Sequence, residues 1–498
     1  MIRSIVLVAL ASANLALPTR APAASAPLLI ENVTVLSPEQ AQPRGNRYVL
    51  VRDGRIVAVS ERPIAAPDAR RLDGRGKYLT PGIMDGHVHV SDAVGLPPGS
   101  TDPAIAILEK QFLEQQPRSY LYFGVTQVVD LINRPERVKE FTARPQHPDT
   151  FRCGVAPVVD GYPLVFWDPA QRYAQFNDYI YEPANAREHP LPKGADPAEH
   201  TPEAVVARIA QTDAICVKIT LEDGFGDRND WPIMSQETLR RVRAATKKHG
   251  LLLVVHANAL DMQRKAVEGQ VDVIVHGLWN WNELQQQPGV PPAIADHLRN
   301  IHDGKIGYIA TLRVIPGVTD LLDPQLLDDP VYAKVVPPAM LKWYRTEPAQ
   351  WFKTEIFGPS PNAAAILGGM RAANEHWATS EHGMRALRHL YELGQPLLLG
   401  SDTPSAPTYG NQPGYDTFKE MRLMAQAGIP LSAIFAAATL NNARQYRVEK
   451  DFGSIEPGKI ANLLLLDANP LADVEAWSRI DKVILHGEPI ERESLAAD

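Results

Sequence analysis

The chain has 498 residues, 45% of them hydrophobic and 22% charged, and a formal net charge of −8 at pH 7. This composition is that of a folded globular protein and excludes a disordered or fibrous chain. The mild acidity gives no electrostatic reason to bind nucleic acid or an anionic membrane surface. The length suffices for one large barrel domain and a smaller one.

The first 26 residues are typical of a secretory signal peptide. Arg3 precedes an apolar run from Ile5 to Leu17, and Ala21 and Ala23 are small residues of the kind found at cleavage sites. A buried first strand or helix is the alternative. The run is shorter than the roughly 20 residues of a transmembrane helix, so we predict no membrane span. We expect an exported protein, periplasmic or secreted.

Two β-rich segments lie near the two ends of the chain. Residues 27–80 contain alternating apolar runs around an Asp53-Gly54 turn, and residues 440–498 contain similar runs around a His486-Gly487 turn. We predict that the two segments form one small β-sandwich domain.

Residues 81–439 alternate apolar strand-like runs with helical patterns, which predicts a parallel sheet covered by helices. Eight such runs indicate an α/β fold built on a distorted (β/α)8 TIM barrel. The candidate strands are 82–90, 126–131, 153–159, 214–220, 251–256, 271–276, 306–312 and 396–402.

One helix and two long connections stand out within the barrel region. Residues 235–248 are predicted to be a helix capped by Ser235 and stopped at Gly250. The connections 160–200 and 315–380 exceed what a minimal barrel needs, so we expect them to form a lid or the pocket wall.

The two cysteines, Cys153 and Cys216, lie within apolar strand-like runs. We expect buried free thiols here, although an exported protein also allows a disulfide.

Histidine and aspartate residues recur at the ends of the candidate strands. His87 and His89 point to the same side of one strand, and His256 and His276 end two later strands. Asp402 ends the last strand, where a buried carboxylate needs a cationic partner. Each of these histidines taken singly can be structural, but the carboxyl ends of barrel strands assemble active sites. The set predicts a metal site, with Asp402 also able to move a proton.

Lys218 lies inside the fourth candidate strand, where an uncompensated ammonium group is costly. A salt bridge to a barrel carboxylate is one explanation. The other is a carbamate formed with carbon dioxide, whose oxygens bridge two cations, and we favour this one because there are more ligands than one tetrahedral ion needs.

The ordered motifs resemble the amidohydrolase superfamily, in particular members similar to imidazolonepropionases and Xaa-Pro dipeptidases. The resemblance covers nearly the whole mature chain, through PGIMDGHVHV, Lys218, His256, His276, LLLGSDTP and the closing AATLNNARQY and FGSIEPGKIANLLLLDANPL. It implies a barrel with a β-sandwich made from both chain ends.

The resemblance also implies a dinuclear centre. His87, His89 and Asp402 would hold one divalent ion and His256 and His276 the other, with carboxylated Lys218 as the bridge. A hydroxide shared by the ions would attack the carbonyl carbon, with Asp402 as proton shuttle. Zinc suits these ligands best, while manganese, cobalt or iron also fit a mixed nitrogen and oxygen site.

The chain departs from the family pattern at three places. Asn462 stands where relatives usually have Asp, which we expect to matter only to the β-sandwich. Gly414-Tyr415-Asp416 stands where many relatives have His before Glu, and Ser401 replaces a frequent Thr. The resemblance therefore does not extend to the substrate contacts of the 414–416 loop.

Four residues that follow candidate strands are candidate substrate contacts: Tyr162, Trp279, Asn280 and Arg313. Arg313 can bind a substrate carboxylate through two hydrogen bonds, although a structural ion pair accounts for it equally well. The aromatic residues can equally be packing residues of a lid.

The leading functional hypothesis is hydrolysis of a C–N amide bond in a small molecule such as a dipeptide, an N-acyl amino acid or a cyclic amide. A lactonase or phosphotriesterase is the alternative within enzymes, because the same chemistry attacks esters. A binding protein that kept the barrel without catalysis belongs to a different class. The sequence leaves homo-oligomer formation open.

Overall fold

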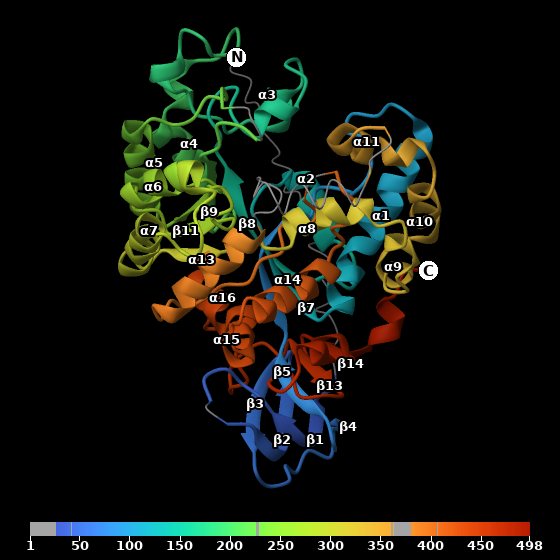
Figure 1. Ribbon diagram of the computed structural model, residues 1–498. Coiled ribbons are helices and arrows are strands. Elements are labelled where there is room, and N and C mark those ends of the chain that lie inside the picture. Colours follow the sequence, from blue (N-terminus) through green and yellow to red (C-terminus); the bar gives the residue numbers. More distant parts are fainter. Residues whose placement is uncertain (1–25, 41, 226–228, 360–361, 363–379, 406) are drawn as a thin grey trace, which may run out of the picture.

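The computed structural model describes residues 26–40, 42–225, 229–359, 362, 380–405 and 407–498 (Figure 1). The predicted signal segment, residues 1–26, lies almost wholly outside these residues. Among the described residues, none of the helices is both long and apolar enough to cross a membrane.

A parallel sheet of seven strands, in the order β12-β11-β10-β9-β8-β7-β6, forms most of the barrel. All of its printed pairings are parallel, and its strands are almost entirely buried, as expected for a sheet covered by helices. The strands are β6 (Ile83–Val88), β7 (Val125–Asp130), β8 (Asp149–Val155), β9 (Cys216–Thr220), β10 (Leu252–His256), β11 (Val273–Val275) and β12 (Gly307–Ile309).

The eighth predicted strand, 396–402, closes the barrel as an irregular segment. It forms only single bridges, Leu398 with Ile309 and Thr403 with Val88. The backbone N–H of Gly86 donates to Leu399 O at 2.9 Å, and that of Asp402 donates to His87 O at 2.7 Å. The segment therefore lies between β12 and β6, and the predicted barrel is confirmed.

Helices follow the barrel strands and cover them (Figure 1). Ser235 accepts a hydrogen bond from Thr238 N, and Gly250 ends the helix at φ +72°, so the predicted start and stop of α5 are confirmed. The main helices are α1 (Pro103–Tyr122), α2 (Pro135–Thr142), α4 (Pro202–Ile209), α5 (Gln236–His249), α6 (Leu260–Glu268), α7 (Pro292–Asp303), α13 (Ser380–Glu392), α14 (Tyr415–Gln426), α15 (Leu431–Ala436) and α16 (Asn442–Gln445).

Both chain ends build a second, mixed sheet of eight strands, at the bottom of Figure 1. Asp53-Gly54 and His486-Gly487 form the hairpin turns, and all four residues have positive φ, as a two-residue turn of this hand requires. The strands are β1 (Leu28–Val35), β2 (Arg44–Arg52), β3 (Arg55–Ser60), β4 (Arg70–Asp73), β5 (Tyr78–Pro81), β13 (Leu463–Leu466), β14 (Ile480–Leu485) and β15 (Glu488–Glu491).

The two long connections take different positions. The segment 160–200 contains the short helix α3 (Arg172–Gln175) and supplies residues to the cavity described below. The connection from 315 contains α8 (Val314–Thr319), α9 (Tyr332–Val335), α10 (Pro338–Tyr344) and α11 (Trp351–Phe357). Tyr344 donates to Val94 O at 2.9 Å and Trp351 to Gly95 O at 3.2 Å, so this part covers the loop after β6.

Cys153 and Cys216 form a disulfide between β8 and β9, so the expectation of free thiols is wrong. The two residues are direct partners in the parallel register, and their Cα atoms are 4.4 Å apart. Bonded sulfurs require Cα atoms at about this distance. The two cysteines are 63 residues apart in the sequence, and this spacing alone does not predict that they face each other on neighbouring strands.

Candidate metal centre

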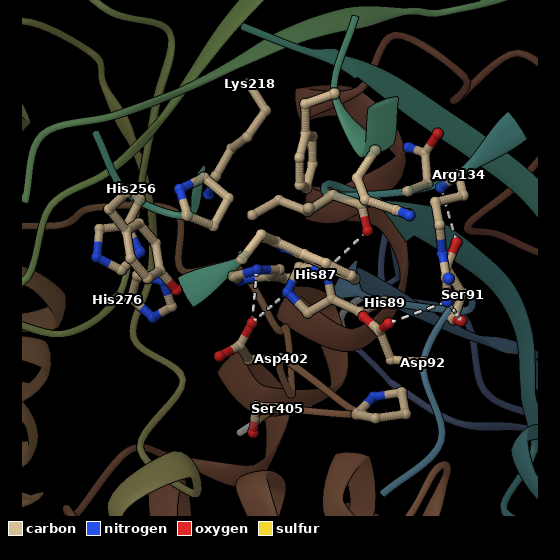
Figure 2. Close-up of a pocket in the computed structure, with 18 residues that line it drawn as sticks. His87, His89, Ser91, Asp92, Arg134, Lys218, His256, His276, Asp402 and Ser405 are labelled. Atoms are coloured by element: carbon tan, nitrogen blue, oxygen red, sulfur yellow. Dashed lines mark hydrogen bonds and ion pairs between the residues drawn. The ribbon is translucent and has the colours of Figure 1, made fainter. Parts of the chain in front are cut away.

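The predicted metal ligands converge at the carboxyl ends of the barrel strands (Figure 2). His87 lies in β6 and His89 follows that strand, while His256 is the last residue of β10 and His276 follows β11. Parallel strands bring these ends to one face of the barrel, where function is usually found. The cavity there is lined by His87, His89, Lys218, His256, His276 and Asp402, together with residues named below.

Asp402 lies between His87 and His89. The Nε2 atoms of both imidazoles are 2.7 Å from its Oδ1. Burial favours the neutral acid, but the interactions with His87 and His89 hold the pKa of Asp402 well below its usual value. Asp402 is therefore a carboxylate, the form that binds a metal ion.

Three groups are placed to share one cation. The ligand atoms of His87, His276 and Asp402 all lie within 4.8 Å of one another. Burial lowers the pKa of His87 to about 3 and that of His276 well below 6.5, so both rings are neutral. Neutral imidazole and carboxylate are ligands that zinc accepts. The resemblance assigned His276 to the same ion as His256, whereas in the structure His276 also lies close enough to His87 and Asp402 to share an ion with them.

Two histidine rings are oriented through the nitrogen that is not directed at the centre. Nε2 of His256 donates to Glu222 Oε2 at 3.0 Å, and Nδ1 of His89 donates to Ile132 O at 3.2 Å. A hydrogen bond on one ring nitrogen fixes the tautomer and leaves the other nitrogen as a ligand. With these hydrogen bonds kept, Nδ1 of His256 and Nε2 of His89 would be the atoms left to bind a metal ion, and Nε2 of His89 would then give up its hydrogen bond to Asp402.

Glu222 was not identified from the sequence, although it lies only two residues beyond β9. Its Oε2 also accepts from Asn258 Nδ2 at 2.7 Å, and the residue is 2% exposed. Thr311, two residues beyond β12, has its hydroxyl 3.0 Å from His276 Nδ1. The histidines were predicted because they are polar residues at the end of a buried strand. The same criterion, extended by two residues, would have identified Glu222 and Thr311.

Lys218 extends from β9 toward the histidines and is completely buried (Figure 2). Burial lowers the pKa of its amine to about 7. Within the described part of the chain, its Nζ has neither a hydrogen bond nor an ion pair. The salt bridge that would explain a buried lysine is thus not formed with these residues.

Two of the candidate ligands have an unusual backbone conformation. His276 has φ +82° and Asp402 has φ +61°, a region that residues other than glycine rarely adopt. Such a conformation costs on the order of 1–3 kcal/mol and persists where the surrounding structure enforces it. The backbone N–H groups of His276 and Asp402 donate to Ile309 O at 2.9 Å and His87 O at 2.7 Å, which ties both residues to neighbouring strands.

The residues fit a divalent cation. His87 Nδ1 and Lys218 Nζ are buried polar atoms without a hydrogen-bond partner among the described residues, which is costly unless another group satisfies them. The donor set of imidazoles and a carboxylate, with an amine beside it, is chemically suited to zinc.

The four candidate substrate contacts divide into two groups. Tyr162 lines the cavity, and its ring centroid is 4.7 Å from that of His256. Trp279 contacts the His276 ring at 5.2 Å, and Asn280 Oδ1 accepts from Asn282 N at 2.9 Å. Neither these two residues nor Arg313 is among the residues that line the cavity.

Arg313 is a buried structural residue. Its guanidinium is paired with Asp320, lies 3.4 Å from Asp416 Oδ1, and donates to Gly410 O at 3.1 Å. Lys419 Nζ is 2.6 Å from the same Asp416 oxygen. The departure of the 414–416 loop from the family pattern thus serves an internal ion-pair network, and Asp416 does not line the cavity.

Several cavity residues were not identified from the sequence. They follow β6, β7 and the closing segment, or belong to the 160–200 connection. They are Ser91, Asp92, Ile132, Asn133, Arg134, Pro163, Trp167, Gln175, Phe176, Pro404 and Ser405. Arg134 brings a cation to the rim, where its backbone N–H donates to Ser91 Oγ at 2.8 Å and its guanidinium lies 3.4 Å from Asp92.

Comparison with known proteins supports the predicted relationship. The model of the amidohydrolase family matches residues 356–490, which include Asp402. The resemblance to the amidohydrolase superfamily is confirmed. A solved Xaa-Pro dipeptidase with bound methionine has the same fold, with a TM-score of 0.64 over 93% of this chain and 100% of that chain at 20% identity.

Curated relatives match over short segments. A dihydroorotase from Anaeromyxobacter sp. (strain K) is 40% identical over 65 residues, 13% of this chain and 15% of the relative. An imidazolonepropionase from Klebsiella pneumoniae is 42% identical over 62 residues, 12% of this chain and 15% of the relative. The chain thus matches less than a fifth of the length of these relatives.

Proposed function

We propose that the protein is a metal-dependent hydrolase that cleaves a C–N amide bond in a small molecule such as a dipeptide, an N-acyl amino acid or a cyclic amide. The observation that carries this proposal is the convergence of His87, His276 and Asp402, whose ligand atoms lie within 4.8 Å of one another in a cavity at the barrel's carboxyl face. Structural similarity to the Xaa-Pro dipeptidase supports the amide class.

The cofactor we propose is a pair of divalent cations, with zinc as the metal. His87, His89 and Asp402 would hold one ion, and His256 and His276 the other. Bound cations would polarise the scissile carbonyl and make a water molecule more acidic.

The protein's own groups supply the remaining functions. Asp402 is ionised and lines the cavity, so its carboxylate can accept a proton from the attacking water and deliver it to the leaving amine. Arg134 lies on the rim, where its guanidinium can bind a substrate carboxylate. Arg313 is not used in this proposal because it is buried and does not line the cavity.

We also propose that Lys218 carries a carbamate that bridges the two ions. Its burial and its lack of a hydrogen bond or ion pair within the described residues support this assignment. The Lys218→Ala variant should lose bound metal, and a short carboxylate such as propionate should restore part of the metal content and activity. Unchanged metal content in the variant would contradict the assignment.

The test of the function is a side-by-side panel of amide, lactone and phosphotriester substrates, with metal analysis of the purified protein. Amide turnover that is lost on chelation and restored by zinc is expected. The Asp402→Asn variant should lose turnover by orders of magnitude, whereas Asp303→Asn, an exposed aspartate at the end of α7, should not.

Lactone or phosphotriester turnover without amide turnover would contradict the amide class. Absence of metal together with absence of activity after metal addition would favour a binding protein on the same barrel.

A further inference from the structure

Four aromatic side chains pack together beside the candidate metal centre, and we call them the aromatic wall: Tyr162, Phe166, Phe225 and Trp231. The first two belong to the connection after β8, and the other two follow β9. The rings of Tyr162 and Trp231 are nearly parallel, with centroids 6.0 Å apart. Phe166 and Phe225 form a second parallel pair at 6.4 Å.

The two pairs are perpendicular to each other. Phe166 meets Trp231 at 5.3 Å and 85°, and Phe225 meets Trp231 at 5.3 Å and 89°. Edge-to-face contacts at such distances are favourable aromatic geometry. A guest ring between two parallel rings would need them about 7 Å apart, since carbon atoms pack at about 3.5 Å. The wall therefore offers its outer faces to a ligand rather than an internal slot.

Two rings of the aromatic wall remain exposed to solvent. Phe166 is 62% exposed and Phe225 is 44% exposed, although each is a large apolar side chain. Single exposed apolar residues are ordinary, but these two rings are stacked on each other. Contiguous exposed apolar surface with a defined shape marks a binding site.

The aromatic wall reaches the metal centre through Tyr162, while Phe166, Phe225 and Trp231 lie beyond the residues that line the cavity. Tyr162 lines the same cavity as the candidate ligands, and its ring is 4.7 Å from that of His256. Phe225 lies edge-on to the same histidine, with centroids 6.4 Å apart. Trp167 and Phe176 extend the apolar lining of the cavity on the same connection. A single substrate could therefore place its scissile bond at the metal centre and an attached apolar group on the aromatic wall.

Polar groups lie on the other side of the ligands. In Figure 2, Arg134, Ser91 and Asp92 are separated from His256 and His276 by His87 and His89. No side chain of the aromatic wall carries a charge. The cavity and the aromatic wall beside it thus offer one polar and one apolar surface, and a ligand with the same division of polarity fits them best.

We propose that the aromatic wall is a substrate subsite for an aromatic or bulky apolar group attached next to the scissile amide. This inference rests on the proposed function for the identity of the cleaved bond. It adds the substrate class: amides whose acyl or amine portion carries a large apolar group, in preference to small polar ones. Phe166 and Phe225 determine this preference by contact with that group.

The test compares matched substrates that differ only in the apolar group. N-benzoylglycine is paired with N-acetylglycine, and N-acetylphenylalanine with N-acetylalanine, so that either side of the amide is examined. The aromatic member of at least one pair should have a kcat/KM at least tenfold higher. Phe166→Ala and Phe225→Ala should each reduce this preference several-fold through KM, leaving kcat and the small substrate nearly unchanged.

Control variants separate ring contact from general damage. Ile107→Ala removes another large apolar side chain that is 59% exposed but lies on α1 and is not part of the aromatic wall, so it should change the turnover of neither substrate. Phe166→Leu retains apolar bulk and should recover part of the preference. Equal loss on both members of a pair, or equal kcat/KM for both in the unaltered protein, would overturn the subsite.

A binding measurement makes the test independent of turnover. By calorimetry, 3-phenylpropionate should bind the zinc-loaded protein more tightly than propionate, and Phe166→Ala should remove the difference. This result without amide hydrolysis would retain the subsite and reject the proposed function. Amide hydrolysis without a preference for the aromatic substrates would retain the proposed function and reject the subsite. A change of oligomeric state in the Phe166→Ala and Phe225→Ala variants, with no change in preference, would assign the wall to contact between copies of the chain.

Discussion

Asn462 donates a hydrogen bond from its side-chain amide to Asp149, with 2.6 Å between Nδ2 and Oδ2. Asn462 precedes β13 of the mixed sheet, and Asp149 begins β8 of the barrel. Asn462 also accepts the backbone N–H of His486 at 2.8 Å. The side chain that departs from the family pattern therefore joins the two sheets, and its amide can both donate and accept here, whereas an ionised Asp could only accept.

Asn462→Asp should destabilise the protein by about 1–3 kcal/mol, because it replaces a hydrogen bond with a buried carboxylate in contact with the partly buried carboxylate of Asp149. The free energy of unfolding measured in urea at pH 7 checks this value. Asp149→Asn in the same chain should restore most of the loss, since it removes the repulsion. Equal stability of the Asn462→Asp variant and the unaltered protein would show that the contact is not formed.

His486 is predicted to make stability depend on pH. Its hydrogen bond to Asp149, 3.0 Å long, raises the pKa of the imidazole above its usual value. A raised pKa in the folded state stabilises the protein below the unfolded pKa of about 6.5, and this contribution is lost as the pH rises through the folded pKa.

The comparison of the unaltered protein with His486→Gln in urea, from pH 5 to 9, measures this contribution. The difference in unfolding midpoint should be largest at low pH and should shrink as the pH rises. It should remain small, because the side chain is 49% exposed and solvent screens the pair. A difference that grows with pH would contradict the assignment.

The Cys153–Cys216 disulfide closes a 63-residue separation in the chain. Replacing both residues by alanine should lower the free energy of unfolding by about 2–4 kcal/mol, the usual effect of such a cross-link. Thiol titration of the unfolded protein provides the direct check: no thiol should react before reduction and both should react after it. Two reactive thiols before reduction would contradict the bond.

Arg134 and Arg313 form a matched pair with opposite expected effects. Arg134→Ala should raise KM about tenfold for substrates that carry a carboxylate and should change stability little, because the residue lines the cavity. Arg313→Ala should lower the free energy of unfolding by about 3 kcal/mol, because it leaves Asp320 without its cation and buried Asp416 with Lys419 alone.

Steady-state kinetics and urea unfolding of the two variants distinguish these roles. A change in KM on Arg313→Ala without a loss of stability would return substrate binding to Arg313, as its place after a candidate strand first indicated.

The sequence by itself determined the architecture and the main chemical groups. Buried β runs alternating with helical patterns predict the barrel, because parallel strands covered on both faces must be apolar throughout. His87, His89, Lys218, His256, His276 and Asp402 were found because each polar residue interrupts an apolar strand or follows directly after it. The period of a strand and the cost of burying a charge are local properties that the sequence records.

The tertiary structure decided which of these groups meet and which side chains serve other purposes. The pairing of Cys153 with Cys216 depends on the register between two strands. The capture of Arg313 by Asp416 depends on where α14 packs, and the hydrogen bond from His256 to Glu222 depends on how the strand ends lie side by side. The aromatic wall likewise combines two connections that are separate in sequence. Contacts between distant segments follow from packing, and no local pattern of residues records them.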